Sequence, residues 1–211
     1  MNSKIPISLT YFRIIIIPFF IFTYFLPTPK GEWISCFIFV IAAFTDYLDG
    51  KLARSMNQES KLGMLLDPVA DKIIVTVALL LMIHDGKIDG FHFYAAVIII
   101  IREVLVSGLR EYLAKIQISL PVTQLSKVKT FIQMFSISVL LSGEPGNLFL
   151  LGYGTIIGIL GLWISTIISV QTGYVNTVKC LKHTSRFFIN LLILFISFWS
   201  KFIMCLSFSG K

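Results

Sequence analysis

The stretch "DYLDGKLARSMNQESKLGMLLDPVADKIIVTVALLLMI", from Asp46 to Ile83, places four aspartates directly before a long apolar run. Such a run is typical of a helix in lipid, where an unpaired charge is costly. Carboxylates that are kept at the edge of a membrane helix usually serve a function. The stretch therefore predicts a membrane helix that carries a polar site at one end.

The composition of the whole chain supports the membrane class. Its 211 residues are 56% hydrophobic and only 14% charged, and the mean hydropathy is +0.85. These values exclude an ordinary soluble domain. The net charge of +7 indicates basic loops beside anionic lipid, and we expect no nucleic-acid partner.

Apolar runs near membrane-spanning length recur along the chain, so we expect an all-α, polytopic membrane bundle of six transmembrane helices. The expected spans are Leu9–Leu26, Trp33–Leu48, Leu65–Ile83, Phe91–Leu113, Val128–Leu141 and Leu148–Val170. Residues 1–178 would form this membrane domain. Residues 179–211 would add a basic segment and a hydrophobic tail, either an interfacial helix or an extra span.

Lysine and arginine in short loops predict the orientation, because they concentrate on the cytoplasmic side of a membrane. If the N-terminus is cytoplasmic, the outer loops hold only Lys30 and Lys87. The cations on the inner side are Lys4, Arg13, Lys51, Arg54, Lys61, Arg110, Lys115, Lys127, Lys129, Lys179, Lys182 and Arg186. This asymmetry places the aspartate stretch near the inner membrane surface.

The four aspartates fall on two helical faces that can meet. Asp46 and Asp49 are three residues apart, and Asp67 and Asp71 are four apart, so each pair shares one side of a helix. Together the carboxylates carry about −4 charges, which two divalent ions would neutralise. Oxygen ligands favour Mg²⁺, Mn²⁺ or Ca²⁺ over zinc, and paired metals are common in phosphoryl displacement.

Small residues lie on the same two faces. Gly50 and Ala53 follow Asp46 and Asp49, and Gly63 precedes Asp67 by one helical turn. Small side chains let a bulky or phosphorylated group approach the backbone. They also serve close packing between membrane helices, but their position beside four aspartates favours a binding site.

The spacing D-x2-D-G-x2-A-R-x8-G-x3-D-x3-D resembles the signature of the CDP-alcohol phosphatidyltransferase family at every fixed position. In this chain the positions are Asp46, Asp49, Gly50, Ala53, Arg54, Gly63, Asp67 and Asp71. The segments "P-x-x-L-T-x-x-R" from Pro6, "IREVLVSGLREYL" and "SKVKT" look most like the bacterial branch that uses glycerol 3-phosphate. That branch often has Asn where this chain has Ser8.

The resemblance implies transfer of a phosphatidyl group from CDP-diacylglycerol to an alcohol, with release of CMP. With glycerol 3-phosphate as the alcohol, the product would be phosphatidylglycerophosphate, an intermediate of phospholipid biosynthesis. The family also implies a homodimer in the bacterial inner membrane, with the active site facing the cytoplasm.

The resemblance also implies roles for individual residues. Asp46, Asp49 and Asp67 would hold two Mg²⁺ or Mn²⁺ ions, and Asp71 would act as the general base and also touch a metal. The CDP-lipid would be bound by Gly50, Ala53, Arg54 and Gly63.

The acceptor needs cations of its own for its phosphate. Candidates on the inner side are Arg110, Lys127 and Lys129, and the fork of an arginine suits phosphate well. Arg102 and Glu103 fall near the middle of the fourth expected span. They would form either a buried ion pair that fixes helix packing or part of the site.

Other readings predict different patterns. Within the family, the acceptor could be phosphatidylglycerol, serine or inositol phosphate. A membrane prenyltransferase would carry two aspartate motifs far apart in the sequence, and a cation transporter would carry carboxylates near the membrane midplane on broken helices. The single compact motif near the inner surface favours the phosphatidyltransferase.

Overall fold

The protein was analysed as a computed structural model. It describes residues 5–27, 29–56, 61–115 and 124–181, with side chains for 15–27, 29–45, 72–111, 113 and 124–174. Within these ranges the regular structure is entirely α-helical, with seven helices and no strand. The all-α prediction is confirmed for this part of the chain.

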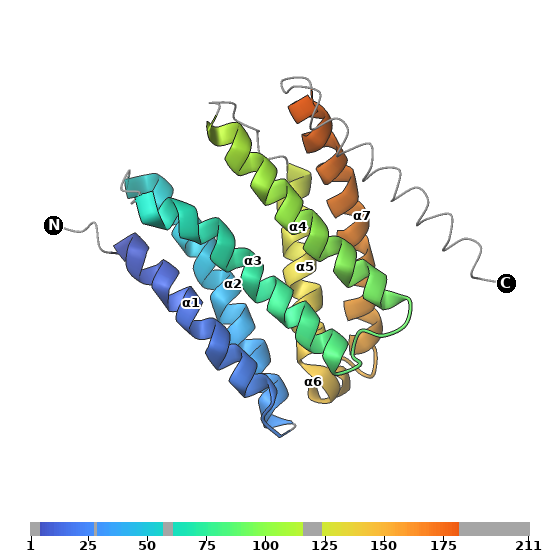
Figure 1. Ribbon diagram of the computed structural model, residues 1–211. Coiled ribbons are helices and arrows are strands. Elements are labelled where there is room, and N and C mark those ends of the chain that lie inside the picture. The colour runs from blue at the N-terminus through green and yellow to red at the C-terminus, as the bar shows by residue number, and fades with distance from the viewer. Residues whose placement is uncertain (1–4, 28, 57–60, 116–123, 182–211) are drawn as a thin grey trace.

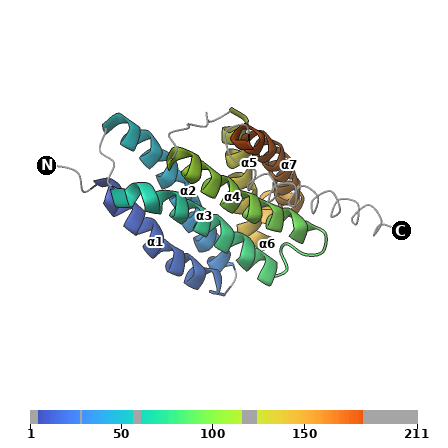
Figure 2. The same ribbon diagram turned by 45° about the horizontal axis from the view of Figure 1, so that its top comes forward.

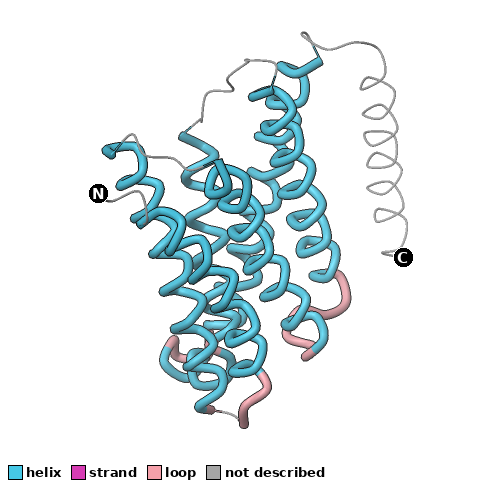
Figure 3. Tube along the Cα trace, turned by 60° about the vertical axis from the view of Figure 1, so that its left-hand side comes forward, coloured by secondary structure: helices cyan, strands magenta, loops and turns pink. Residues whose placement is uncertain are grey.

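Six of the helices are long, and one is short (Figure 1). They are α1 (Ile5–Tyr24), α2 (Lys30–Met56), α3 (Lys61–His84), α4 (His92–Lys115), α5 (Gln124–Leu141), α6 (Gly143–Phe149) and α7 (Gly154–Leu181). Successive long helices run in opposite directions. Hence α2 ends and α3 begins at one end of the bundle, here called the motif end, and the described connections gather at the opposite end (Figure 3).

The helices cover most of each predicted span, and most of their ends lie within four residues of the prediction. Helix α2 continues beyond Leu48 to Met56, and α3 begins at Lys61 instead of Leu65, so the whole motif apart from residues 57–60 lies on helices. Helix α7 continues to Leu181. Hydropathy could not predict these extensions, because polar turns of a helix can project beyond the apolar span.

The short helix α6 was not predicted, and the expected start of the sixth span at Leu148 was wrong. Leu148 lies in the last turn of α6, which ends at Phe149, and α7 begins only at Gly154. Gly143 has φ +53°, Leu151 φ +55° and Gly152 φ +84°. These three residues have left-handed backbone conformations and turn the chain. The sequence gives no sign of this turn, because the residues around Leu148 are as apolar as those of a membrane span.

Two groups of helices make up the bundle (Figure 2). Helices α1, α2 and α3 pack on one another, and α7 packs against both α4 and α5. The two groups are joined by contacts of α2 with α5 and of α3 with α4 and α5. The buried residues between them are apolar and include Phe20, Phe39, Leu79, Met82, Ile99, Ile137, Leu141 and Leu162. The core thus ties the motif helices to the helices that carry Arg110 and Lys129.

The exterior of the bundle is apolar, whereas its interior contains many hydroxyl groups. Phe19, Phe37 and Phe131 are exposed, while Ser35 and Ser169 are completely buried. So many exposed large apolar side chains are unusual for a soluble protein and suit a lipid surround. Two stretches, His92–Glu111 and Gly154–Tyr174, are long and apolar enough to cross a membrane.

Glycines of α7 bring this helix close to α5. A Cβ atom added to Gly158 would lie 2.6 Å from Cγ of Leu140, and one added to Gly161 would collide with the hydroxyl of Ser136. Packing between small residues is a usual way for membrane helices to associate. These glycines therefore serve contact between helices of one chain.

A buried ion pair fixes the end of the bundle opposite the motif. Nζ of Lys87, in the connection between α3 and α4, lies 2.7 Å from Oε1 of Glu32 in the first turn of α2. The ammonium of Lys87 also lies 5.6 Å from the ring centre of Tyr24. The carboxylate of Glu32 fills the space beside Gly143, so the pair connects α1, α2, the α3–α4 connection and α6.

We expect Gly143→Ala to destabilise the protein more than Gly86→Ala. Both glycines have positive φ, and this strain alone costs roughly 1 kcal/mol for alanine. A Cβ at Gly143 would also displace the carboxylate of Glu32, whereas Gly86 has open space around it. Thermal unfolding in detergent measures the difference, and equal shifts for the two variants would contradict this account of Gly143.

Candidate functional site

The aspartate motif lies on two antiparallel helices that meet at the motif end. Asp46 and Asp49 are in α2, and Asp67 and Asp71 are in α3. Residues 57–60 and the side chains of residues 46–71 lie outside the described part of the structure. The helical backbone nevertheless places each pair on one side of its helix.

Helix geometry also gives the depth of each aspartate. Asp46 lies ten residues before the end of α2, and Asp71 lies ten residues after the start of α3. At 1.5 Å per residue, each is about 15 Å along its helix from the connected ends. By the same count, Asp49 and Asp67 both lie about 10 Å along, so along the helix axes the motif has two levels, each with one aspartate position from each helix.

The residue types fit hard divalent cations. All four side chains offer carboxylate oxygens, the ligands that Mg²⁺ and Mn²⁺ prefer. Among the side chains that the structure describes, no other group of three or more His, Cys, Asp or Glu residues could hold a metal. The motif is therefore the candidate metal site.

The motif's remaining residues were predicted to bind the CDP-lipid. Gly50, Ala53 and Arg54 lie in the last part of α2, and Gly63 lies in the first turn of α3. Each therefore lies closer to the motif end than Asp46 or Asp71. Their side chains belong to the range that is not described, and their binding role stays a prediction.

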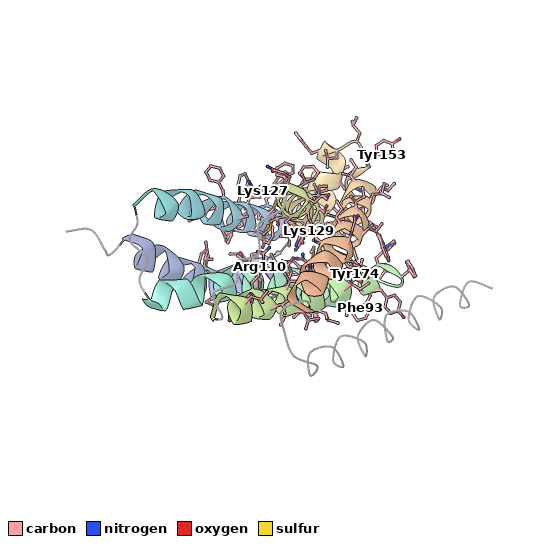
Figure 4. All side chains as sticks on the ribbon, turned by 90° about the horizontal axis from the view of Figure 1, so that it is seen from above. Phe93, Arg110, Lys127, Lys129, Tyr153 and Tyr174 are labelled. Atoms are coloured by element: carbon pink, nitrogen blue, oxygen red, sulfur yellow. The ribbon has the colours of Figure 1, made fainter. Side chains whose placement is uncertain are left out.

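The three predicted acceptor cations lie toward the motif end, on α4 and α5, but their environments differ (Figure 4). Arg110 and Lys127 are exposed. Lys129 is buried, with 3% of its surface exposed. Two residues along a helix correspond to about 200° of rotation, so Lys127 and Lys129 lie on opposite sides of α5.

Lys129 belongs to a buried group of charges that we call the Glu103 cluster: Arg102 and Glu103 of α4, Lys129 of α5, and Ser169 and Thr172 of α7. Lys129 Nζ donates a hydrogen bond to Glu103 Oε1, and Arg102 Nη1 lies 3.4 Å from the same oxygen. Arg102 Nε donates to the carbonyl of Ser169 at 3.0 Å, and Nη2 donates to Thr172 Oγ1 at 2.9 Å. The ion pair considered for Arg102 and Glu103 is present, although both side chains are only partly buried, and it includes the buried Lys129.

The Glu103 cluster lies near the end of the aspartate motif. Lys72, which follows Asp71, is close enough for its charge to interact with those of Glu103 and Lys129. Beside the cluster, Oε1 of Gln133 and Oγ of Ser169 are buried without a hydrogen-bond partner among the described residues. Such atoms are places where an ordered water is expected.

The sequence did not single out Gln133, Ser169 or Thr172, although a signal was present. Ser165, Ser169 and Thr172 recur every three or four residues along α7, which places them on one face of the helix. In a helix surrounded by lipid, such a polar stripe faces the protein interior. The stripe therefore predicts the side of α7 that turns toward α4 and α5.

Comparison with known proteins identifies the family. The sequence profile of CDP-alcohol phosphatidyltransferase matches residues 3–171. The chain belongs to the CDP-alcohol phosphatidyltransferase family. The match includes the aspartate motif, Arg110, the three charged residues of the Glu103 cluster and most of α7.

Three curated relatives of this phosphatidyltransferase share the name CDP-diacylglycerol--glycerol-3-phosphate 3-phosphatidyltransferase. The protein of Rickettsia bellii is 36% identical over 87% of this chain and 98% of its own length. That of Wigglesworthia glossinidia brevipalpis is 44% identical over 80% and 90%. That of Salmonella typhimurium is 41% identical over 67% and 78%.

We expect Asp71→Asn to weaken the binding of Mn²⁺ by at least about tenfold, because even residues that only orient metal ligands contribute that much. Electron paramagnetic resonance of Mn²⁺ added to the purified protein measures the bound fraction. Asp89→Asn is the matched control, since Asp89 is exposed at the opposite end of the bundle. Unchanged Mn²⁺ binding in Asp71→Asn would contradict its assignment as a ligand.

Proposed function

We infer that the protein transfers the phosphatidyl group of CDP-diacylglycerol to glycerol 3-phosphate. The products are phosphatidylglycerophosphate and CMP, and the reaction belongs to phospholipid biosynthesis. The observation that carries this inference is the family membership together with relatives of that one name at 36–44% identity. The placement of the complete motif at one end of two adjacent helices supports it.

We further propose that the six long helices span a bacterial inner membrane, with the motif end in the cytoplasm. The basic residues of the loops support this orientation. Lys30 and Lys87 belong to the opposite end, whereas Arg110, Lys115 and Lys127 belong to the motif end. The cytoplasmic orientation gives the site access to glycerol 3-phosphate. We also propose that the protein acts as a homodimer.

The aspartates have distinct roles in the proposed reaction. Asp46, Asp49, Asp67 and Asp71 would hold two Mg²⁺ or Mn²⁺ ions, which supply positive charge to the diphosphate and to the departing CMP. Asp71 is the proposed general base and accepts the proton of the attacking hydroxyl. The new bond joins the acceptor oxygen to the phosphorus of the phosphatidyl group, and the bond from that phosphorus to the CMP oxygen breaks.

The donor is proposed to bind along the part of the motif nearest the helix ends. Gly50, Ala53 and Gly63 have little or no side chain, which lets the cytidine and ribose approach the helix backbone. Arg54 offers a guanidinium to a phosphate of the donor. The acyl chains would remain beside the apolar outer surface of the bundle.

The acceptor brings a second phosphate, which needs positive charge that the aspartates cannot provide. Arg110, Lys127 and Lys129 are the candidates for this charge. The exposure of Arg110 and Lys127 favours direct contact of these two with the phosphate. Arg110 has the stronger case because a guanidinium can bind two phosphate oxygens at once.

Release of CMP from CDP-diacylglycerol by the purified protein with Mg²⁺ tests the function. The assay is run with glycerol 3-phosphate, serine, inositol phosphate or phosphatidylglycerol, and with Asp71→Asn as the inactive control. We expect release that requires glycerol 3-phosphate. Release with a different acceptor would overturn the acceptor assignment, and no release with any of them would overturn the proposed activity.

We expect Arg110→Gln to raise the KM for glycerol 3-phosphate by about thirtyfold, because a charged hydrogen bond contributes about 2 kcal/mol. The KM for CDP-diacylglycerol should remain nearly unchanged. Initial rates of CMP release at varied concentrations of each substrate measure both constants. Lys30→Gln, which removes an exposed cation from the opposite end, is the control, and an equal rise in both KM values would argue against acceptor contact.

A further inference from the structure

Lys129 differs from the other acceptor candidates in being buried and already paired. Its ammonium donates to the carboxylate of Glu103, and only 4% of its side chain is exposed. A phosphate dianion that approached Lys129 would also approach the negative charge of Glu103. This arrangement suits an ammonium that holds protein groups together better than one that receives a ligand.

The carboxylate of Glu103 is the centre of a connection between three helices. Glu103 and Arg102 belong to α4, and Lys129 belongs to α5. Arg102 carries the connection on to α7 through the carbonyl of Ser169 and the hydroxyl of Thr172. The charges of Arg102, Glu103 and Lys129 sum to +1, so Glu103 cancels one of the two positive charges that the cluster holds within the bundle.

The exposed cations are attached to two of these helices. Arg110 lies two turns from Glu103 along α4, close enough to Arg102 for their charges to repel each other. Lys127 lies two residues before Lys129 on α5. The contact that fixes α4 relative to α5 at Glu103 therefore also fixes the distance between Arg110 and Lys127.

We propose that Glu103 is a positioning residue for the acceptor. By joining Lys129 to Arg102 and so to α7, it sets the spacing of Arg110 and Lys127, which bind the phosphate of glycerol 3-phosphate. Lys129 acts through this connection and does not bind the phosphate. The inference rests on the proposed function and assigns a role to a carboxylate outside the aspartate motif.

Two variants test the proposal because the alternatives predict opposite effects on KM. In Glu103→Gln the cluster has a charge of +2, and Lys129 lacks its buried counter-charge. If Glu103 positions the helices, the KM for glycerol 3-phosphate rises, by about tenfold for a displacement under 1 Å. If Lys129 binds the phosphate directly, removal of the competing carboxylate leaves this KM unchanged or lowers it.

The double variant Glu103→Lys/Lys129→Glu exchanges the two partners, so an ion pair still links α4 to α5 and the cluster charge stays at +1. An exchanged pair leaves no uncompensated buried charge, unlike a single substitution. We expect its KM for glycerol 3-phosphate to return to within about threefold of the unsubstituted protein. A double variant with a strongly raised KM would overturn the proposal and make Lys129 a direct ligand, and this comparison holds even if Glu103→Gln alone fails to fold.

Glu32→Gln provides the matched control. It removes a buried carboxylate from its lysine partner, Lys87, at the opposite end of the bundle. We expect Glu32→Gln to lower the unfolding temperature and to leave the ratio of the two KM values unchanged. Glu103→Gln should instead raise the KM for glycerol 3-phosphate and leave the KM for CDP-diacylglycerol unchanged. Equal effects of the two variants on both KM values would overturn the proposal. Absence of CMP release with glycerol 3-phosphate in the unsubstituted protein would instead contradict the proposed function.

Discussion

The apolar exterior of the bundle is the constraint on which the rest of the structure depends. Lipid offers no hydrogen bonds, so a charged group must lie at the end of a helix or pair with another group inside. Both solutions occur here. Glu32 and Lys87 pair at the opposite end, and Arg102, Glu103 and Lys129 pair within the bundle, while Arg110 and Lys127 are exposed toward the motif end.

Much of the fold can be predicted from the sequence. In lipid, the backbone hydrogen bonds of a segment must be satisfied by the protein itself, and a helix satisfies them within the segment. Apolar runs located all six long helices. The short helix α6 was not predicted, because Leu148, Phe149 and Leu151 are as apolar as the residues of a membrane span. Only the left-handed conformations at Gly143, Leu151 and Gly152 reverse the chain there, and hydropathy contains no information about backbone angles.

The candidate site was predictable to the extent that its chemistry requires fixed spacing. The aspartates had to recur every three or four residues to share helix faces, and the structure confirms that they lie on helices. The difference between Lys127 and Lys129 was not predicted. In this bundle the buried face of α5 includes Lys129, Gln133 and Ser136, so polarity does not distinguish the inside of the helix from its exposed side.

The proposed reaction brings together two anions, a diphosphate lipid and a phosphorylated alcohol, which repel each other unless each has its own positive charge. Metal ions held by four aspartates would serve the first, and exposed side chains of α4 and α5 would serve the second. The pairing of Lys129 with Glu103 keeps these two sources apart, because an unpaired ammonium inside the bundle would attract either phosphate. In this view Glu103 limits the positive charge inside the bundle, and the exposed cations decide where the acceptor binds.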